Sequence, residues 1–197
     1  RNYVQDKYKT IQTVNELYKL KLQSFNELKI PDIDQRLNSS LGILRSIDSE
    51  QSVIDYYEVL NRQVYETVAY FAKKTKEATN RKKLVFVFYG YNWVEQPRGG
   101  ITQCRSGHVN IEEMISNPDV DYIAAPYEYS FRQLEGVVSG QGAVGSVIRR
   151  GKQYLHEFDG STYLKNCWPS EHHNPTTPAE SGNLLRRDMT KALMEGA

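Results

Sequence analysis

Three apolar segments that each end in a polar, aromatic tip constrain the fold of this chain more than any other feature. They cover residues 84–91 (LVFVFYGY), 120–129 (VDYIAAPYEY) and 152–159 (KQYLHEFD). Helical or loop segments separate them, and this alternation is typical of a parallel sheet whose ligands bind beyond the carboxyl ends of the strands. The pattern therefore predicts an α/β fold, with Glu157 placed at the end of the third strand, where such proteins keep their chemistry.

The first 83 residues are predicted to be mainly helical. Apolar residues recur at three- and four-residue steps over residues 2–28, which predicts a single amphipathic helix ended by Pro31. Residues 32–49 look irregular, and a second long helix is predicted from about Glu50 to Thr79. The lysines and arginines between residues 73 and 83 are interpreted as a solvated helix end, favoured there by the helix dipole.

Residues 84–197 form three predicted β/α units, and the last helix, about 181–195, is expected to be capped by Gly196. No repeat or linker is visible, so residues 1–197 are interpreted as a single domain. Three strands cannot close a barrel, and they leave two sheet edges open. We therefore expect a portion of a larger (β/α) domain.

Charge and composition exclude several classes of function. The chain has 25 Lys and Arg against 24 Asp and Glu, which argues against nucleic acid and anionic membranes as partners. No run of about eighteen apolar residues is present to span a membrane. Cys104 and Cys167 are too few for a disulfide framework or a four-cysteine zinc site. Because the chain starts at Arg1 rather than Met, its native N-terminus is expected to lie upstream, and the compartment stays open.

Glu157 is the main candidate for catalysis. A carboxylate at the end of an inner strand is costly to bury unless it is paired or used, so it is predicted to act as a nucleophile or acid/base. The alternative is an ion pair with Arg132, Arg149 or Arg150. Glycoside cleavage needs two carboxylates, and further glutamates lie near the strand tips: Glu95, Glu128 and Glu135. Among these, Glu128 is the best partner, although exposure or an ion pair explains it more simply.

Two other motifs are weak. Gly140-x-Gly142-x-x-Gly145 matches the dinucleotide fingerprint, but no strand leads directly into it and Gly151 interrupts any following helix, so we interpret it as a flexible active-site loop. Histidines and carboxylates near the third strand match no metal-ligand spacing; they are His156, Glu157, Asp159, His172 and His173. The sequence thus predicts neither a cofactor nor a metal.

Several motifs in order resemble a known family. They are Phe88-Tyr89-Gly90-Tyr91, Asn117-Pro118-Asp119-Val120-Asp121-Tyr122, Ala125-Pro126-Tyr127-x-Tyr129-x-x-Arg132, Gly151-Lys152-x-x-x-x-Glu157-x-Asp159 and Leu185-Arg186-Arg187-Asp188. Over about residues 50–197 the chain resembles the second half of the TIM barrel in the clan of retaining glycosidases. The nearest family is glycoside hydrolase family 42, whose members are β-galactosidase-like.

The resemblance implies a partial (β/α)8 barrel, about strands five to seven with their helices. Glu157 matches the strand-seven nucleophile, and the strand-four acid/base is expected upstream of Arg1. The residues expected to contact the sugar or to orient groups in the site are Tyr127, Tyr129, Arg132, Asp159 and Trp168. The implied activity is retaining hydrolysis of a β-glycosidic bond, without a cofactor, as part of a larger catalytic domain. The isolated chain is then expected to be inactive. Family members often form trimers, so a homo-oligomer is a further expectation.

Two alternatives stay open. The first is a non-catalytic carbohydrate-binding barrel that has lost the chemistry, which would lack the upstream glutamate. The second is an α/β protein that binds a phosphate or nucleotide through helix ends or the glycine-rich segment. For this second protein, Gly142→Ala would abolish ligand binding while Glu157→Gln would not.

Overall fold

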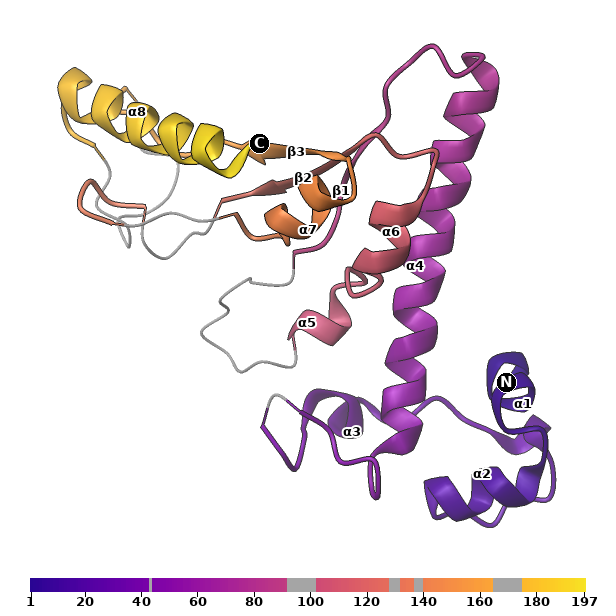
Figure 1. Cartoon of the computed structure of the whole chain (residues 1–197). Helices are drawn as coiled ribbons and strands as arrows, with labels where there is room; N and C mark the ends of the chain where they lie inside the picture. The colour runs from indigo at the N-terminus through magenta and orange to yellow at the C-terminus, as the bar shows by residue number, and fades with distance from the viewer. Residues whose placement is uncertain (43, 92–101, 128–131, 137–139, 165–174) are drawn as a thin grey trace. The chain divides into compact units, whose positions relative to one another are not determined.

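The structure is a computed structural model and describes residues 1–42, 44–91, 102–127, 132–136, 140–164 and 175–197 (Figure 1). Contacts divide the chain into two compact units. One comprises residues 1–64 and 96–107, and the other comprises residues 65–95 and 108–197. Within the described residues, no helix is both long enough and apolar enough to cross a bilayer.

The N-terminal unit begins with several short helical segments: α1 (Asn2–Tyr8), α2 (Ile11–Tyr18), a 3-10 turn (Phe25–Glu27) and α3 (Ile33–Leu37). The prediction of one helix over residues 2–28 is therefore wrong. Lys9 and Lys19 follow α1 and α2 with φ angles of 65° and 57°, which end each helix. The Thr10 hydroxyl accepts a hydrogen bond from the Thr13 N–H and starts α2. The apolar stripe continues across these breaks, so periodicity alone did not reveal them.

Residues 32–49 were predicted to be irregular, but they contain α3. Its start is fixed by a capping box, in which Asp32 and Gln35 each bind the other's backbone N–H. The short helix α5 (Thr102–Arg105) also belongs to this unit.

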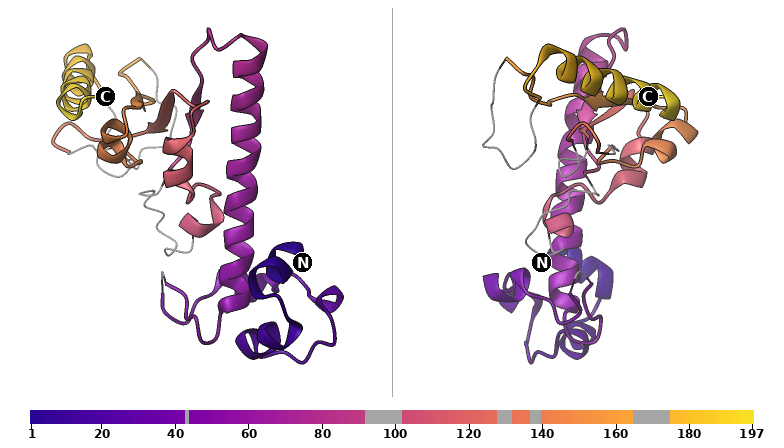
Figure 2. Two further views of the ribbon diagram at one scale, coloured as in Figure 1. Left: turned by 45° about the vertical axis from the view of Figure 1, so that its right-hand side comes forward. Right: turned by 90° about the vertical axis from the view of Figure 1, so that its left-hand side faces the viewer.

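The long helix α4 (Gln51–Ala78) confirms the prediction almost to the residue. It supplies the first part of its length to one unit and the remainder to the other. Figure 2 shows α4 and the C-terminal helix as unbroken helices. In the N-terminal unit α4 buries Asp55, whose carboxylate binds Lys7 Nζ at 3.0 Å and the Tyr18 hydroxyl at 2.5 Å. These contacts attach α1 and α2 to α4.

The second unit contains a parallel sheet of three strands in the order β1-β2-β3. The strands are β1 (Phe86–Phe88), β2 (Tyr122–Pro126) and β3 (Gln153–Glu157). All three predicted strands are confirmed, each shorter than expected. The strands pair in register, with Phe88 opposite Ala124 and Ala124 opposite Leu155. The chain is thus an α/β protein with a small parallel sheet.

Three helices follow the strands: α6 (Ile111–Ser116), α7 (Val144–Arg149) and α8 (Pro178–Glu195). The last begins earlier than predicted because the Thr177 side chain caps it and Pro178 occupies the first turn. Gly196, with a φ of 78°, ends it as predicted. The C-terminal end of α8 lies beside β3 (Figure 1).

The two faces of the sheet differ. Successive side chains of a strand point to opposite faces, and the face carrying Ile123 and Tyr154 is buried. On the opposite face Phe86, Phe88 and Leu155 remain 55%, 44% and 44% exposed. Gly142, two residues before α7, lies against the Tyr154 ring, and Glu195 at the end of α8 lies against the neighbouring His156. Both helices therefore lie on the buried face, and the other face carries large exposed apolar side chains.

One predicted surface feature is wrong. Lys76 belongs to the basic run that was interpreted as solvated, yet its side chain is buried and its Nζ lies 2.5 Å from Asp121 Oδ2. Asp121 precedes β2, 45 residues away along the chain. A partner at that distance is not visible in the local charge pattern.

Candidate functional site

The candidate site lies where β2 and β3 end. Pro126 and Glu157 are opposite one another in the register, so the residues after them leave the same edge of the sheet. The rings of Tyr127 and Phe158 follow and lie 5.7 Å apart. In parallel sheets this carboxyl edge is where ligands bind.

Glu157 lies on the open face of the sheet. It alternates with the buried Tyr154 and the largely buried His156 and shares the exposed face with Leu155. The prediction assumed an inner strand, whereas β3 is an edge of the described sheet and Glu157 is exposed. Its carboxylate therefore needs no compensating partner, and it forms no ion pair with any residue that the structure describes.

None of the three arginines proposed as alternative partners forms an ion pair with Glu157 among the described residues. Arg132 pairs with Asp159, and Arg150 pairs with Glu112. Arg149 is exposed at the end of α7. These contacts remove the simplest structural explanation for a carboxylate at the tip of β3.

Arg132, Asp159 and Tyr127 are brought together, as expected of predicted site residues at neighbouring strand tips. Arg132 Nη2 lies 2.6 Å from Asp159 Oδ1 and donates to the Tyr127 carbonyl oxygen at 2.9 Å. The guanidinium carbon lies 4.0 Å from the centre of the Tyr127 ring. Only 13% of the Arg132 side chain is exposed. The cation is thus neutralised and covered, which leaves carboxylate oxygens as the groups presented to solvent.

Tyr127 is held rigidly in this cluster. Burial raises the pKa of its hydroxyl to about 12, so the hydroxyl keeps its proton at neutral pH. A β-carbon at Gly160 would overlap that hydroxyl, so the chain passes close to the ring only because residue 160 is glycine. Tyr127 can therefore donate a hydrogen bond but is not available as an open stacking platform.

The segment from Gly140 to Gly142 was expected to be an active-site loop, but the sequence did not reveal that it packs closely on β3 and on Tyr127. Gln141 is buried, and its Nε2 donates to the Tyr127 carbonyl oxygen at 3.2 Å. A β-carbon at Gly142 would lie 2.7 Å from the Tyr154 hydroxyl, and one at Gly140 would lie 2.9 Å from His156 Cε1. Close packing on β3 explains both glycines. The available signal was the pair of glycines flanking a single polar residue.

His156 links the buried face of β3 to α8. Its Nε2 lies 3.2 Å from Glu195 Oε2, and its ring lies between those of Tyr154 and Phe158. Burial lowers the pKa of His156, and the neighbouring Glu195 opposes that shift only in part. The imidazole is therefore held largely neutral.

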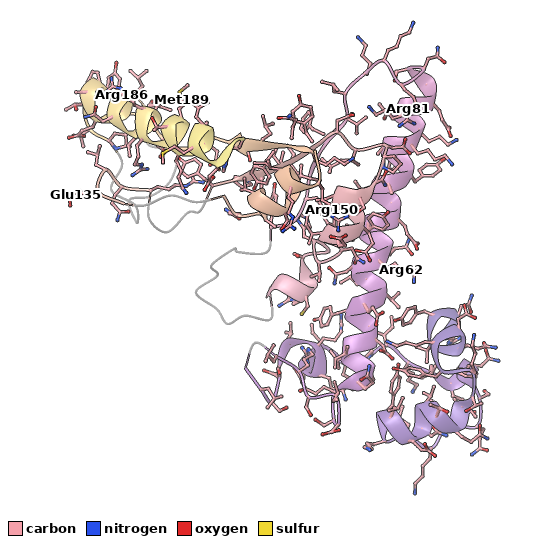
Figure 3. The ribbon with its side chains drawn as sticks, in the orientation of Figure 1. Arg62, Arg81, Glu135, Arg150, Arg186 and Met189 are labelled. Atoms are coloured by element: carbon pink, nitrogen blue, oxygen red, sulfur yellow. The ribbon has the colours of Figure 1, made fainter. Side chains whose placement is uncertain are left out.

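The described residues contain no group of three His, Cys, Asp or Glu side chains arranged to hold a metal ion. Glu135 is exposed in the turn after β2 (Figure 3). Several residues named in the sequence predictions lie outside the described residues: Glu95, Glu128, Tyr129, Cys167, Trp168, His172 and His173.

Comparison with known proteins adds no family assignment. No protein-family model matches the chain, and no curated protein or solved structure matches it significantly.

Proposed function

We propose that this chain is the nucleophile-bearing part of a retaining glycoside hydrolase of the β-galactosidase-like type. The observation that carries the proposal is the exposed carboxylate of Glu157 on the open face of a parallel sheet, at its carboxyl edge. Asp159 follows two residues later and is oriented by Arg132 at 2.6 Å. The proposal also draws on the resemblance to family 42 described above.

The sheet supports a partial barrel, about strands five to seven. Its strands are parallel and follow one another in chain order. The segment leading into α7 and the end of α8 both contact the same face of the sheet. A doubly wound sheet reverses its strand order and carries helices on both faces. In a (β/α)8 barrel the strands follow chain order throughout, and all helices lie on the outer face. In a barrel Phe88 and Leu155 would form an interior layer below Glu157, and further strands would pair with β1 and β3.

The reaction would proceed in two displacements. Glu157 would attack the anomeric carbon, the bond to the leaving oxygen would break, and an acid outside this chain would protonate that oxygen. Water would then attack the same carbon and give its proton to that second group, releasing Glu157 as a carboxylate. In retaining enzymes the two carboxyl groups lie about 5 Å apart. Asp159 and the Tyr127 hydroxyl would bind or orient sugar hydroxyls.

The test uses the polypeptide in which this chain occurs, exposed to a 2-deoxy-2-fluoro-β-galactoside with a good leaving group. The expected result is a covalent label on the peptide containing Glu157, found by mass spectrometry. The Glu157→Gln variant and the 197-residue chain alone serve as controls and should stay unlabelled.

The other outcomes are informative. A label on a different carboxylate would show that the strand assignment is wrong. If galactosides bind to the polypeptide without any label, the non-catalytic carbohydrate-binding alternative is favoured. If no sugar in a panel binds, the proposal fails.

A further inference from the structure

The guanidinium of Arg187 in α8 donates hydrogen bonds to the Asp188 carboxylate and to the turn formed by residues 132–136. Its Nε donates to Asp188 Oδ1 at 2.8 Å, and its Nη2 donates to the Arg132 carbonyl oxygen at 3.2 Å. Its Nη1 donates to the carbonyl oxygens of Gln133 and Gly136 at 2.5 and 3.0 Å. Every guanidinium nitrogen is thus used, and most of these bonds reach a segment more than fifty residues away.

The turn that Arg187 binds covers residues 132–136 and carries Arg132. It is closed by a hydrogen bond from the Gly136 N–H to the Gln133 carbonyl oxygen at 2.9 Å. Arg132 in turn binds Asp159 and the Tyr127 carbonyl oxygen. A continuous series of contacts therefore leads from α8 through the turn to the carboxylate that lies two residues beyond Glu157.

On α8, a buried carboxylate fixes the orientation of Arg187. Asp188 is buried, and it orients Arg187 from the adjacent position on the helix. A guanidinium is a planar fork of several donors, and its shape matches a set of converging carbonyl oxygens better than the single nitrogen of lysine does. The neighbouring Arg186 (Figure 3) is exposed, and its Nη1 donates to Asn183 Oδ1 on the same helix.

We infer that Arg187 is a positioning residue of the candidate site, acting through the turn 132–136 and Arg132 to hold Asp159 beside Glu157. The catalytic consequence of this inference rests on the proposed function. The positioning itself does not, because it concerns contacts within the chain and has a readout of its own.

The test replaces Arg187 by lysine, which keeps a positive charge beside the buried Asp188 but cannot donate to all of these acceptors. In the 197-residue chain, the exchange rate of the Gly136 amide should rise at least tenfold. The side-chain Nε–H signal of Arg132, observed by ¹⁵N NMR, should broaden or shift. The matched control Arg186→Lys should change neither signal. Circular dichroism should show that α8 stays helical in both variants.

In the longer polypeptide, Arg187→Lys should lower kcat for an aryl β-galactoside about 10- to 100-fold, because small displacements of orienting groups have effects of that size. KM should change less than kcat. Free guanidinium should restore part of the activity of Arg187→Ala, and it should have no effect on Arg186→Ala.

The outcomes separate the two proposals. If the Gly136 exchange rate and the Arg132 signal match the wild type, the positioning role of Arg187 is refuted. If both change but kcat of an active enzyme does not, the catalytic consequence of the inference is refuted. If both change and the wild-type polypeptide hydrolyses no glycoside, Arg187 still positions Arg132 and only the proposed function fails. Should Arg187→Lys not fold, the double variant Arg187→Gln/Asp188→Asn removes the buried charge together with the fork and takes its place.

Discussion

Lys76 and Asp121 form an ion pair that joins the end of α4 to the starts of two strands. Lys76 Nζ lies 2.5 Å from Asp121 Oδ2 and also donates to the Lys83 carbonyl oxygen at 2.8 Å. The same carboxylate oxygen accepts the Val85 N–H at 2.7 Å, just before β1. Only 4% of Lys76 is exposed. The pair thus sets how α4 meets the amino edge of the sheet, opposite to the edge that carries the candidate site.

Asp121→Asn should destabilise the second unit by about 2–3 kcal/mol. It leaves the buried Lys76 ammonium without its counter-charge, and breaking a buried pair from one side costs about 3–5 kcal/mol, reduced here because Asp121 is partly exposed. Arg81 (Figure 3) is the control, because its side chain is 58% exposed and pairs with Asp119, so removing it should cost under about 1 kcal/mol. Urea unfolding measures both, and equal costs would contradict the importance of the buried pair.

Gly142→Ala should destabilise the protein by about 1–3 kcal/mol, the usual cost of overpacking. The new methyl group would lie 2.7 Å from the Tyr154 hydroxyl. Gly145→Ala is the matched control, because Gly145 lies within α7 with open space around it and alanine favours helix by about 1 kcal/mol. In thermal denaturation, Gly142→Ala should lower the melting temperature and Gly145→Ala should raise it. Loss of a nucleotide ligand without loss of stability in Gly142→Ala would instead favour the phosphate-binding alternative.

Glu157→Gln should change the free energy of unfolding by less than about 0.5 kcal/mol. The side chain is exposed and forms no described ion pair, and substitutions at such positions are usually near neutral. Chemical denaturation of the 197-residue chain is the measurement. Any loss of glycoside hydrolysis in the longer polypeptide would then be attributable to chemistry. A large loss of stability would show instead that Glu157 has a structural role.

Stability should fall as the pH decreases from about 7.5 to 5. Burial lowers the pKa of His156, with partial opposition from Glu195, and burial also lowers the pKa of His108. The unfolded chain, in which a histidine titrates near 6.5, therefore binds more protons than the folded chain in this range. Urea midpoints measured across the range should show a slope that is reduced in His156→Gln and reduced further when His108→Gln is added. An unchanged slope in both variants would refute this account.

Phe88→Ala should cost little in the 197-residue chain, where the ring is 44% exposed, but about 3–5 kcal/mol in the complete barrel of the proposed enzyme. The difference is expected because a closed barrel would bury the open face of the sheet. Ile123→Val lies on the buried face and should cost about 0.5–1.5 kcal/mol in both. Similar costs of Phe88→Ala in the two settings would argue against a barrel.

Periodic patterns in the sequence predicted the elements that depend on neighbouring residues. The apolar repeat predicted a long helix from about Glu50 to Thr79, and α4 extends over 28 residues between nearly the same bounds. The apolar segments ending in polar tips likewise predicted β1, β2, β3 and their order. The helix breaks at Lys9 and Lys19 were not predictable, because a positive φ angle at a lysine does not change the pattern of apolar residues.

The candidate site was predictable in position but not in its internal connections. The ends of β2 and β3 located Tyr127, Arg132, Asp159 and Glu157 at one edge of the sheet. Which carboxylate Arg132 binds was open from the sequence, since Asp159 and Glu157 are only two residues apart. The tertiary structure assigns the arginine to Asp159 and leaves Glu157 exposed.

What the sequence determined by itself is therefore the local structure: the α/β order of elements, the long helix, the terminal Gly196 cap and the residues at the strand tips. These depend on backbone preferences and on side chains within a few positions of one another. Only the tertiary structure decided that Lys76 is buried against Asp121 and that Arg187 binds the turn carrying Arg132. Such contacts join residues about fifty positions apart, and their partners are selected by the packing of whole helices on the sheet.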